Sequence, residues 1–114
     1  MTKNILFLLP PAFEDNGQTE MCLESMTVAG ILSAFPAIGE TLEIRYQPIA
    51  KPRPDMTALL GLENQNCPTL VLSDGVEAGP GVHVQAACDV RFLDNARDIA
   101  KYFAHRYGTP FPRA

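Results

Sequence analysis

The chain has 114 residues, 46% of them hydrophobic and 19% charged, and a formal net charge of −4. This length suits one domain with a buried core, so we expect residues 1–114 to form a single domain. The acidic balance gives no electrostatic reason to expect a nucleic acid or an anionic membrane surface as a partner. Three cysteines, an odd number without regular spacing, are not typical of a disulfide-stabilised secreted domain.

The location that we expect is cytoplasmic. The apolar run at Ile5–Leu9 resembles a signal peptide only briefly, because Pro10 and Pro11 stop it and no small-residue cleavage site follows. No stretch of the sequence is long enough to span a bilayer as a helix.

The first half of the chain predicts two strands separated by a helix. Asn4–Leu9 is apolar throughout, which favours a strand buried on both faces. A polar loop at 11–18 follows, and Thr19 is the expected N-cap of an amphipathic helix that ends at Phe35. Thr41–Ile49 alternates between apolar and polar residues, as in a strand at a sheet edge.

The second half predicts two more strands and two helices. A short helix is expected from Asp55 to Leu60, closed by Gly61. Thr69–Leu72 is a second continuous apolar strand, and Val90–Leu93 is a shorter one. The closing helix is expected to start at an Asp94 N-cap, to bury residues 96, 99, 100, 103 and 107, and to stop at Gly108. Val82–Val84 is a weaker candidate for a small extra strand.

The predicted order is therefore β-α-β-α-β-β-α. The two apolar strands should be central and the alternating strand should lie at an edge. Right-handed crossovers would make the first three strands parallel, and the short link to the last strand favours an antiparallel pairing there. We expect a four-stranded mixed sheet with helices on both faces, which is the thioredoxin-like fold in its compact, glutaredoxin-sized form.

Cys22 is the main candidate for chemistry. A thiol at the amino end of a helix meets free backbone N–H groups and the positive end of the helix dipole, and both favour the thiolate. Glu20 and Glu24 oppose this, because like charges disfavour ionisation. Ser25 stands where a dithiol oxidoreductase carries its second cysteine, so this motif supplies one thiol at most.

These residues also carry a resemblance. Cys22-x-x-Ser25 follows the first strand, Pro68 directly precedes the third, and the closing strand runs into Asp94-Asn95. In this order the chain resembles thioredoxin-fold proteins, and its last third resembles the amino-terminal domain of glutathione transferases. Nearly the whole chain is similar to a small bacterial family of uncharacterised thioredoxin-like proteins, whose members often have Cys-x-x-Cys in place of Cys22-x-x-Ser25.

The resemblance implies a ligand-binding edge. It implies a cis peptide bond before Pro68, so that the backbone of Cys67 can bind an extended peptide or glutathione; the alternative is a trans proline that merely begins a strand. It also implies that Asp94 and Asn95 hold the γ-glutamyl end of glutathione. For Asp94 the alternative is an ordinary helix N-cap.

Cys67 offers a second hypothesis about thiol chemistry. If the implied fold is right, Cys67 lies near Cys22 and could act as the resolving thiol that Ser25 cannot be, provided that the two Cα atoms lie within roughly 7 Å. The alternative is that Cys67 is a small buried hydrophobic residue, as most free cysteines are.

The function that these residues favour is a monothiol, glutaredoxin-related protein that binds glutathione or an extended thiol peptide near Cys22 and Pro68. We expect glutathione as a co-substrate and no tightly bound cofactor. Leu23-Glu24 differs from the Gly-Phe of iron–sulfur-binding relatives, and the spacing of His83, Cys88 and His105 fits no zinc signature. The competing hypothesis is a non-catalytic interaction module that keeps the fold, with Cys22 structural. The sequence does not identify the substrate or the oligomeric state.

Overall fold

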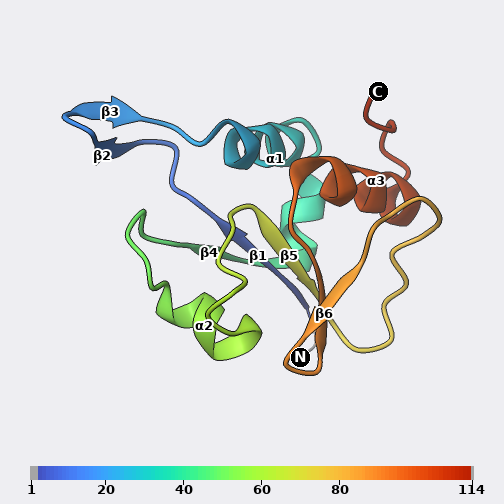
Figure 1. Cartoon of the computed structure of the whole chain (residues 1–114). Coiled ribbons are helices and arrows are strands. Elements are labelled where there is room, and N and C mark those ends of the chain that lie inside the picture. The colour runs from blue at the N-terminus through green and yellow to red at the C-terminus, as the bar shows by residue number, and fades with distance from the viewer. Residues whose placement is uncertain (1–2, 114) are drawn as a thin grey trace.

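A computed structural model describes residues 3–113 of the chain (Figure 1). Its strands are β1 (Asn4–Leu8), β2 (Phe13–Asp15), β3 (Gln18–Glu20), β4 (Leu42–Tyr46), β5 (Thr69–Leu72), β6 (Gln85–Ala87) and β7 (Val90–Leu93). Its helices are α1 (Leu23–Ala34), the 3-10 helix η1 (Pro36–Thr41), α2 (Pro54–Leu60) and α3 (Ala96–Tyr107). Among these residues, no helix combines the length and the apolar character needed to cross a membrane.

The main sheet has five strands in the order β4-β1-β5-β7-β6. The prediction of an α/β protein with a mixed sheet is confirmed, with the apolar strands β1 and β5 inside the sheet and β4 at its edge. β1 pairs in parallel with β4, as predicted, and β7 pairs antiparallel with β5. The predicted parallel direction of β5 is wrong, because β5 pairs antiparallel with β1.

The strand count also differs from the prediction. The additional edge strand is β6, which pairs antiparallel with β7 through a tight turn. It begins at Gln85, after the predicted extra strand at Val82–Val84, which is not part of any strand. The turn at Cys88 and Asp89 has positive φ angles at both residues, the geometry of the two-residue turns that join twisted strands.

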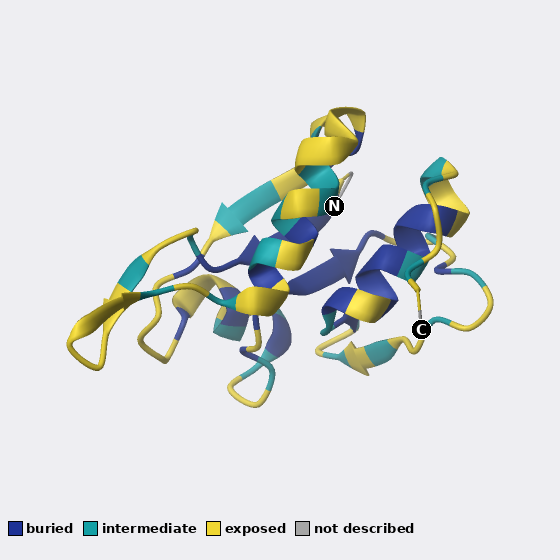
Figure 2. Cartoon of the chain, turned by 90° about the horizontal axis from the view of Figure 1, so that it is seen from above, coloured by how far each residue is buried: buried dark blue, intermediate teal, exposed yellow. Residues whose placement is uncertain are grey.

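Helices cover both faces of the sheet, as predicted (Figure 1). On one face, α1 and α3 pack on a cluster that includes Leu6, Leu70 and Phe103. On the other face, α2 packs on a cluster that includes Phe7, Met56 and Val71. Figure 2 shows the central strands as buried and the outer side of α1 as exposed. The alternation of side chains along β1 thus divides its apolar residues between two cores.

The segment before α1 was predicted as a loop running into a Thr19 N-cap, and this was wrong. Residues 13–20 instead form the hairpin β2–β3, which turns at Asn16 and Gly17, both with positive φ. This hairpin projects from the main sheet (Figure 1). The helix consequently starts three residues later than predicted, with Cys22 as its N-cap.

Candidate functional site

Cys22 stands at the amino end of α1, beyond the carboxyl end of β1. Its side chain caps the helix, since the Ser25 N–H donates to Cys22 Sγ at 3.4 Å. Ser25 is buried, and its Oγ accepts a hydrogen bond of 3.2 Å from the Leu9 N–H. Ser25 therefore fastens the first turn of α1 to the end of β1, and this places the half-buried Cys22 thiol.

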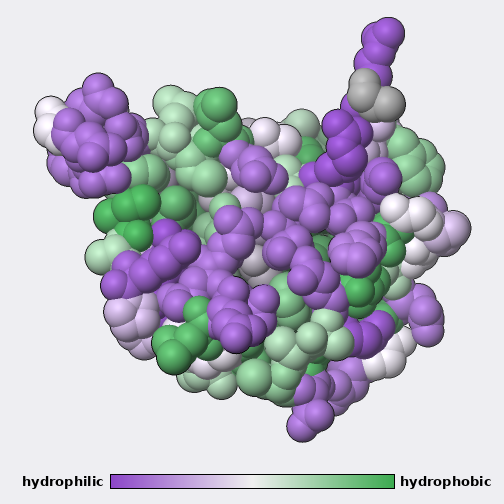
Figure 3. Space-filling model, viewed as in Figure 1, coloured by the Kyte–Doolittle hydropathy of each residue, from purple (hydrophilic) through white to green (hydrophobic). Residues whose placement is uncertain are grey.

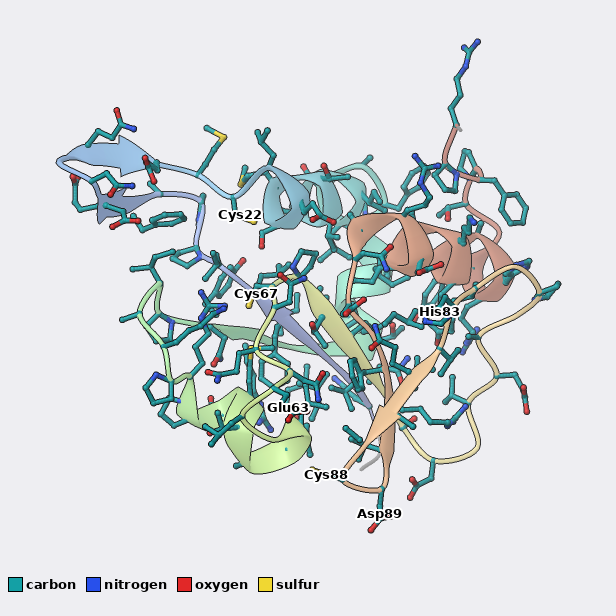
Figure 4. The ribbon with its side chains drawn as sticks, viewed as in Figure 1. Cys22, Glu63, Cys67, His83, Cys88 and Asp89 are labelled. Carbon is teal, nitrogen blue, oxygen red and sulfur yellow. The ribbon has the colours of Figure 1, made fainter. Side chains whose placement is uncertain are left out.

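The turn before β5 faces this thiol. The Cys67–Pro68 peptide bond is cis, as the resemblance implied. Cys22 Sγ lies 3.7 Å from the carbonyl oxygen of Cys67, in the geometry of a weak S–H···O hydrogen bond (Figure 4). Two segments 45 residues apart in the sequence thus meet at the position that the sequence indicated.

The side chain of Cys67 is buried in the core cluster that includes Met56 of α2, and Cys22 packs against the same cluster. Cys67 is 5% exposed, and its Sγ lies 3.7 Å from Met56 Sδ and 3.8 Å from Arg53 Nη1. Burial raises the pKa of Cys67 to about 11, although the Arg53 charge works in the opposite direction. All three cysteines are free. Pairing of Cys22 with Cys67 stays a prediction, and in this arrangement Cys67 packs as a small buried residue.

Arg53 is the residue of this region that sequence reasoning missed. It is 4% exposed, and its guanidinium donates to the carbonyl oxygens of Pro48 at 2.8 Å, Ile49 at 3.0 Å and Gln65 at 2.6 Å. Its backbone N–H also donates to Gln65 Oε1 at 2.6 Å. The guanidinium thereby fixes the segment that leads into the Cys67–Pro68 turn. Backbone carbonyls leave no sequence signature, so no pattern in the sequence indicates this role of Arg53.

The start of α3 lies beside the same turn. The Asn66 side chain donates to the carbonyl oxygen of Asp94 at 2.7 Å, and the Ala96 N–H donates to Glu24 Oε1 at 3.1 Å. Asn95, rather than the predicted Asp94, is the N-cap, because the Asn95 side chain accepts from the Asp98 N–H. Through these contacts the amino ends of α1 and α3 and the loop before Pro68 lie together at one edge of the molecule.

The surroundings of Cys22 are exposed and of mixed polarity. Its neighbours Met21 and Leu23 are 57% and 75% exposed. The β2–β3 hairpin forms a hydrophilic knob at one corner of the molecule in Figure 3. Its acids bond within the hairpin: Glu14 accepts from the Thr19 hydroxyl and Glu20 accepts from the Gln18 amide. Glu24, expected to oppose the thiolate, is instead engaged at the start of α3.

The weaker candidates of the sequence do not join this site. His83 and Cys88 lie apart from Cys22 and Cys67 (Figure 4), and His105 bonds to the Pro80 carbonyl oxygen at 2.8 Å. No group of three or more histidine, cysteine and acidic residues within 3–113 has an arrangement that could hold a metal ion.

The arrangement of the site provides one accessible thiol beside a backbone carbonyl. A thiolate is the species that attacks disulfide sulfurs, and unpaired backbone groups at a turn are the groups that bind extended ligands. Ser25 cannot substitute for a second thiol in such a cycle, because a hydroxyl group forms no disulfide; its Oγ instead accepts from the Leu9 N–H.

Comparison with known proteins assigns the chain to a family. Residues 3–111 match the model of "Protein of unknown function (DUF3088)", and the chain belongs to this family. Searches among curated proteins and among solved structures found no match.

Proposed function

We propose that this protein is a thioredoxin-like monothiol protein that exchanges its Cys22 thiol with glutathione or with an extended thiol peptide. The observation that carries the proposal is the approach of Cys22 Sγ to the Cys67 carbonyl oxygen, at 3.7 Å. A ligand lying along the turn before β5 would bring its own sulfur next to Cys22 while its backbone pairs with Cys67. The parallel β1–β4 pair, followed by the antiparallel β5 and β7, supports the thioredoxin-like assignment.

The proposed reaction is a pair of thiol–disulfide exchanges. The Cys22 thiolate attacks one sulfur of a disulfide, so a new bond from Cys22 to that sulfur forms and the other half leaves as a thiolate that takes up a proton. Glutathione thiolate then attacks the mixed disulfide and releases Cys22. This first cycle consumes one glutathione and leaves a mixed disulfide between glutathione and the half of the substrate that was bound to Cys22. In a second cycle the Cys22 thiolate attacks the glutathionyl sulfur of that mixed disulfide, the remaining half of the substrate leaves as a thiolate that takes up a proton, and a second glutathione thiolate releases Cys22 as oxidised glutathione forms. Asp94 and Asn95, beside the turn, are the proposed contacts for the γ-glutamyl end.

A second candidate function is a non-catalytic interaction module. It is favoured by one observation: Cys22 Sγ already serves as the N-cap of α1, a structural role that needs no chemistry. In that case Cys22 could be replaced by another capping residue without functional loss.

Reduction of a small disulfide by glutathione tests the two functions. Cys22→Ser is a suitable variant because serine is a good N-cap, so the helix should be retained. We expect Cys22→Ser to lose the glutathione-dependent rate, whereas Cys88→Ser, at an exposed cysteine, should keep it. Equal rates for the wild type and Cys22→Ser would overturn the enzymatic proposal and favour the module.

A further inference from the structure

A groove between α1 and α3 lies outside the thiol site. Its cavity of about 510 Å³ is bounded by Thr27 and Ile31 of α1, by the C-cap residue Phe35, by Ala100 of α3, and by residues of the segment 109–113. Figure 2 shows the outer side of α1 as largely exposed, whereas α3 is mostly buried. A volume of this size is typical of sites for small molecules.

The middle of the groove is apolar, and charged residues lie at its margins. Ile31 is half-buried, Phe35 is 41% exposed, and Ala100 leaves space between the helices. A second hollow of about 560 Å³ shares Phe35 and Thr109 with the first. The two hollows therefore adjoin at Phe35, and together they favour an elongated ligand over a compact one.

Positive charge lines this apolar surface. Arg97 extends from α3 towards the C-terminal segment, where its Nη1 donates to the carbonyl oxygen of Arg113 at 3.4 Å. This hydrogen bond uses one of the five N–H donors of the Arg97 guanidinium. The acid of the groove, Glu24, already accepts from the Ala96 N–H. Within residues 3–113 the one salt bridge joins Arg45 to Glu43, far from Arg97 in the sequence.

We propose that this groove binds an elongated apolar molecule that ends in a carboxylate, with its chain along Ile31 and Phe35 and its carboxylate at Arg97. The apolar lining supplies affinity by removing hydrocarbon from water, and the guanidinium supplies the charge and fork geometry that a carboxylate accepts. This site is independent of Cys22 and of the function proposed for it.

Decanoate is the probe, used with the full chain and below its critical micelle concentration. Calorimetry measures its affinity, and amide chemical shifts locate it. Decanol, with the same chain and no charge, is the matched ligand. We expect decanoate to shift amides of α1 and α3, and to bind more tightly than decanol.

Two variants distinguish the contribution of the Arg97 charge to binding from that of the apolar groove. Arg97→Ala should weaken decanoate roughly tenfold, the scale of one charge-assisted hydrogen bond, and leave decanol unchanged. Thr27→Trp places a large side chain in the groove from an exposed position, so it should abolish binding of both ligands without disturbing the core. Arg91→Ala, on β7, should change neither affinity.

The proposal is overturned by any of three results. These are the absence of shifts at α1 and α3 up to the micelle limit, equal affinities for decanoate and decanol, and an Arg97→Ala variant that binds decanoate as tightly as Arg91→Ala does.

Discussion

Cys22 and Cys67 belong to the same small region, yet their environments differ in almost every respect. Cys22 is half-buried at a helix terminus with exposed residues on either side, and its Sγ contacts a backbone carbonyl. Cys67 contributes that carbonyl, while its own thiol is packed against Met56 and Arg53. The difference shows that nearness of two cysteines does not make them equivalent. Solvent access separates the half-buried thiol of Cys22 from the packed thiol of Cys67.

The largest expected effect is in alkylation of the native protein. Iodoacetamide should modify Cys22 roughly a hundredfold faster than Cys67 or more, because Cys67 is buried and its raised pKa keeps it protonated at neutral pH. Peptide mapping after timed quenching measures both rates, and Cys88 serves as the exposed reference. Comparable rates for Cys22 and Cys67 would show that the turn before β5 opens readily.

The predicted disulfide between Cys22 and Cys67 can be tested by oxidation with oxidised glutathione. If Cys67 resolves Cys22, oxidised glutathione should convert a Cys88→Ser protein into a species lighter by two hydrogens. A stable adduct of one glutathionyl group, as expected for the Cys67→Ala variant in the same background, would instead mean that Cys22 acts alone. Intact mass distinguishes the two products.

Removal of Arg53 should have the next largest effect, on stability. Arg53→Met would leave the carbonyl oxygens of Pro48, Ile49 and Gln65 without their shared donor, at a cost on the order of 3 kcal/mol in the free energy of unfolding. Arg45→Met is the matched control, because Arg45 pairs with Glu43 at the surface and should cost under about 1 kcal/mol. Urea unfolding measures both, and a similar loss in the two variants would contradict the role given to Arg53.

Alkaline pH should destabilise the protein through Cys67. Because burial raises the pKa of this thiol to about 11, the folded state keeps its proton over a range where the unfolded chain has lost it. The contribution of Cys67 to the free energy of unfolding is fully present below pH ~9. It is lost between pH 9 and about 11, and the loss is on the order of 2 kcal/mol.

Comparison with Cys67→Ala isolates this contribution. Burial also raises the pKa of Tyr102, but that phenol titrates in both proteins. The difference in free energy of unfolding between wild type and variant should therefore shrink as the pH rises. A difference that stays constant from pH 8 to 11 would show that the thiol is more hydrated than its 5% exposure suggests.

The smallest expected effect concerns the placement of Cys22. Ser25→Ala removes the acceptor of the Leu9 N–H and should cost about 1 kcal/mol. Ser33→Ala, at an exposed position of the same helix, should change stability little. If Ser25 holds the first turn, Ser25→Ala should also change the alkylation rate of Cys22, whereas Ser33→Ala should not. Unaltered alkylation in Ser25→Ala would mean that α1 positions the thiol without this bond.

The sequence predicts the interior of the molecule better than its periphery. Asn4–Leu8 and Thr69–Leu72 are apolar after their first residue, and both are central strands. The strand β6 consists of Gln and Ala, which have little preference for strands, so no pattern marks it. The hairpin β2–β3 lies outside the sheet and lacks an apolar alternation, although its Asn16-Gly17 pair is a known hairpin signal.

Strand direction and long-range contacts were beyond the reach of local patterns. The 22 residues between Tyr46 and Thr69 are enough for β5 to return in either direction, so the pattern of its side chains does not settle its pairing. For the site, the sequence indicates a helix-terminal Cys22, and the cis turn at Pro68 beside it was implied by the resemblance to thioredoxin-fold proteins. The contacts of Arg53 and the Glu24–Ala96 bond could not be predicted, because the partners in each case are backbone groups, which every residue has and no sequence pattern marks.

The guanidinium of Arg53 also has a consequence for local motion. Arg53 donates hydrogen bonds to residues 48, 49 and 65. If one of these segments moves away, Arg53 is held less firmly and its bonds to the other segments weaken. The loop after β4, the start of α2 and the turn before β5 should then open as one cooperative unit, with a common opening free energy in hydrogen exchange. The backbone of Cys67 would then become accessible only when all three segments open together.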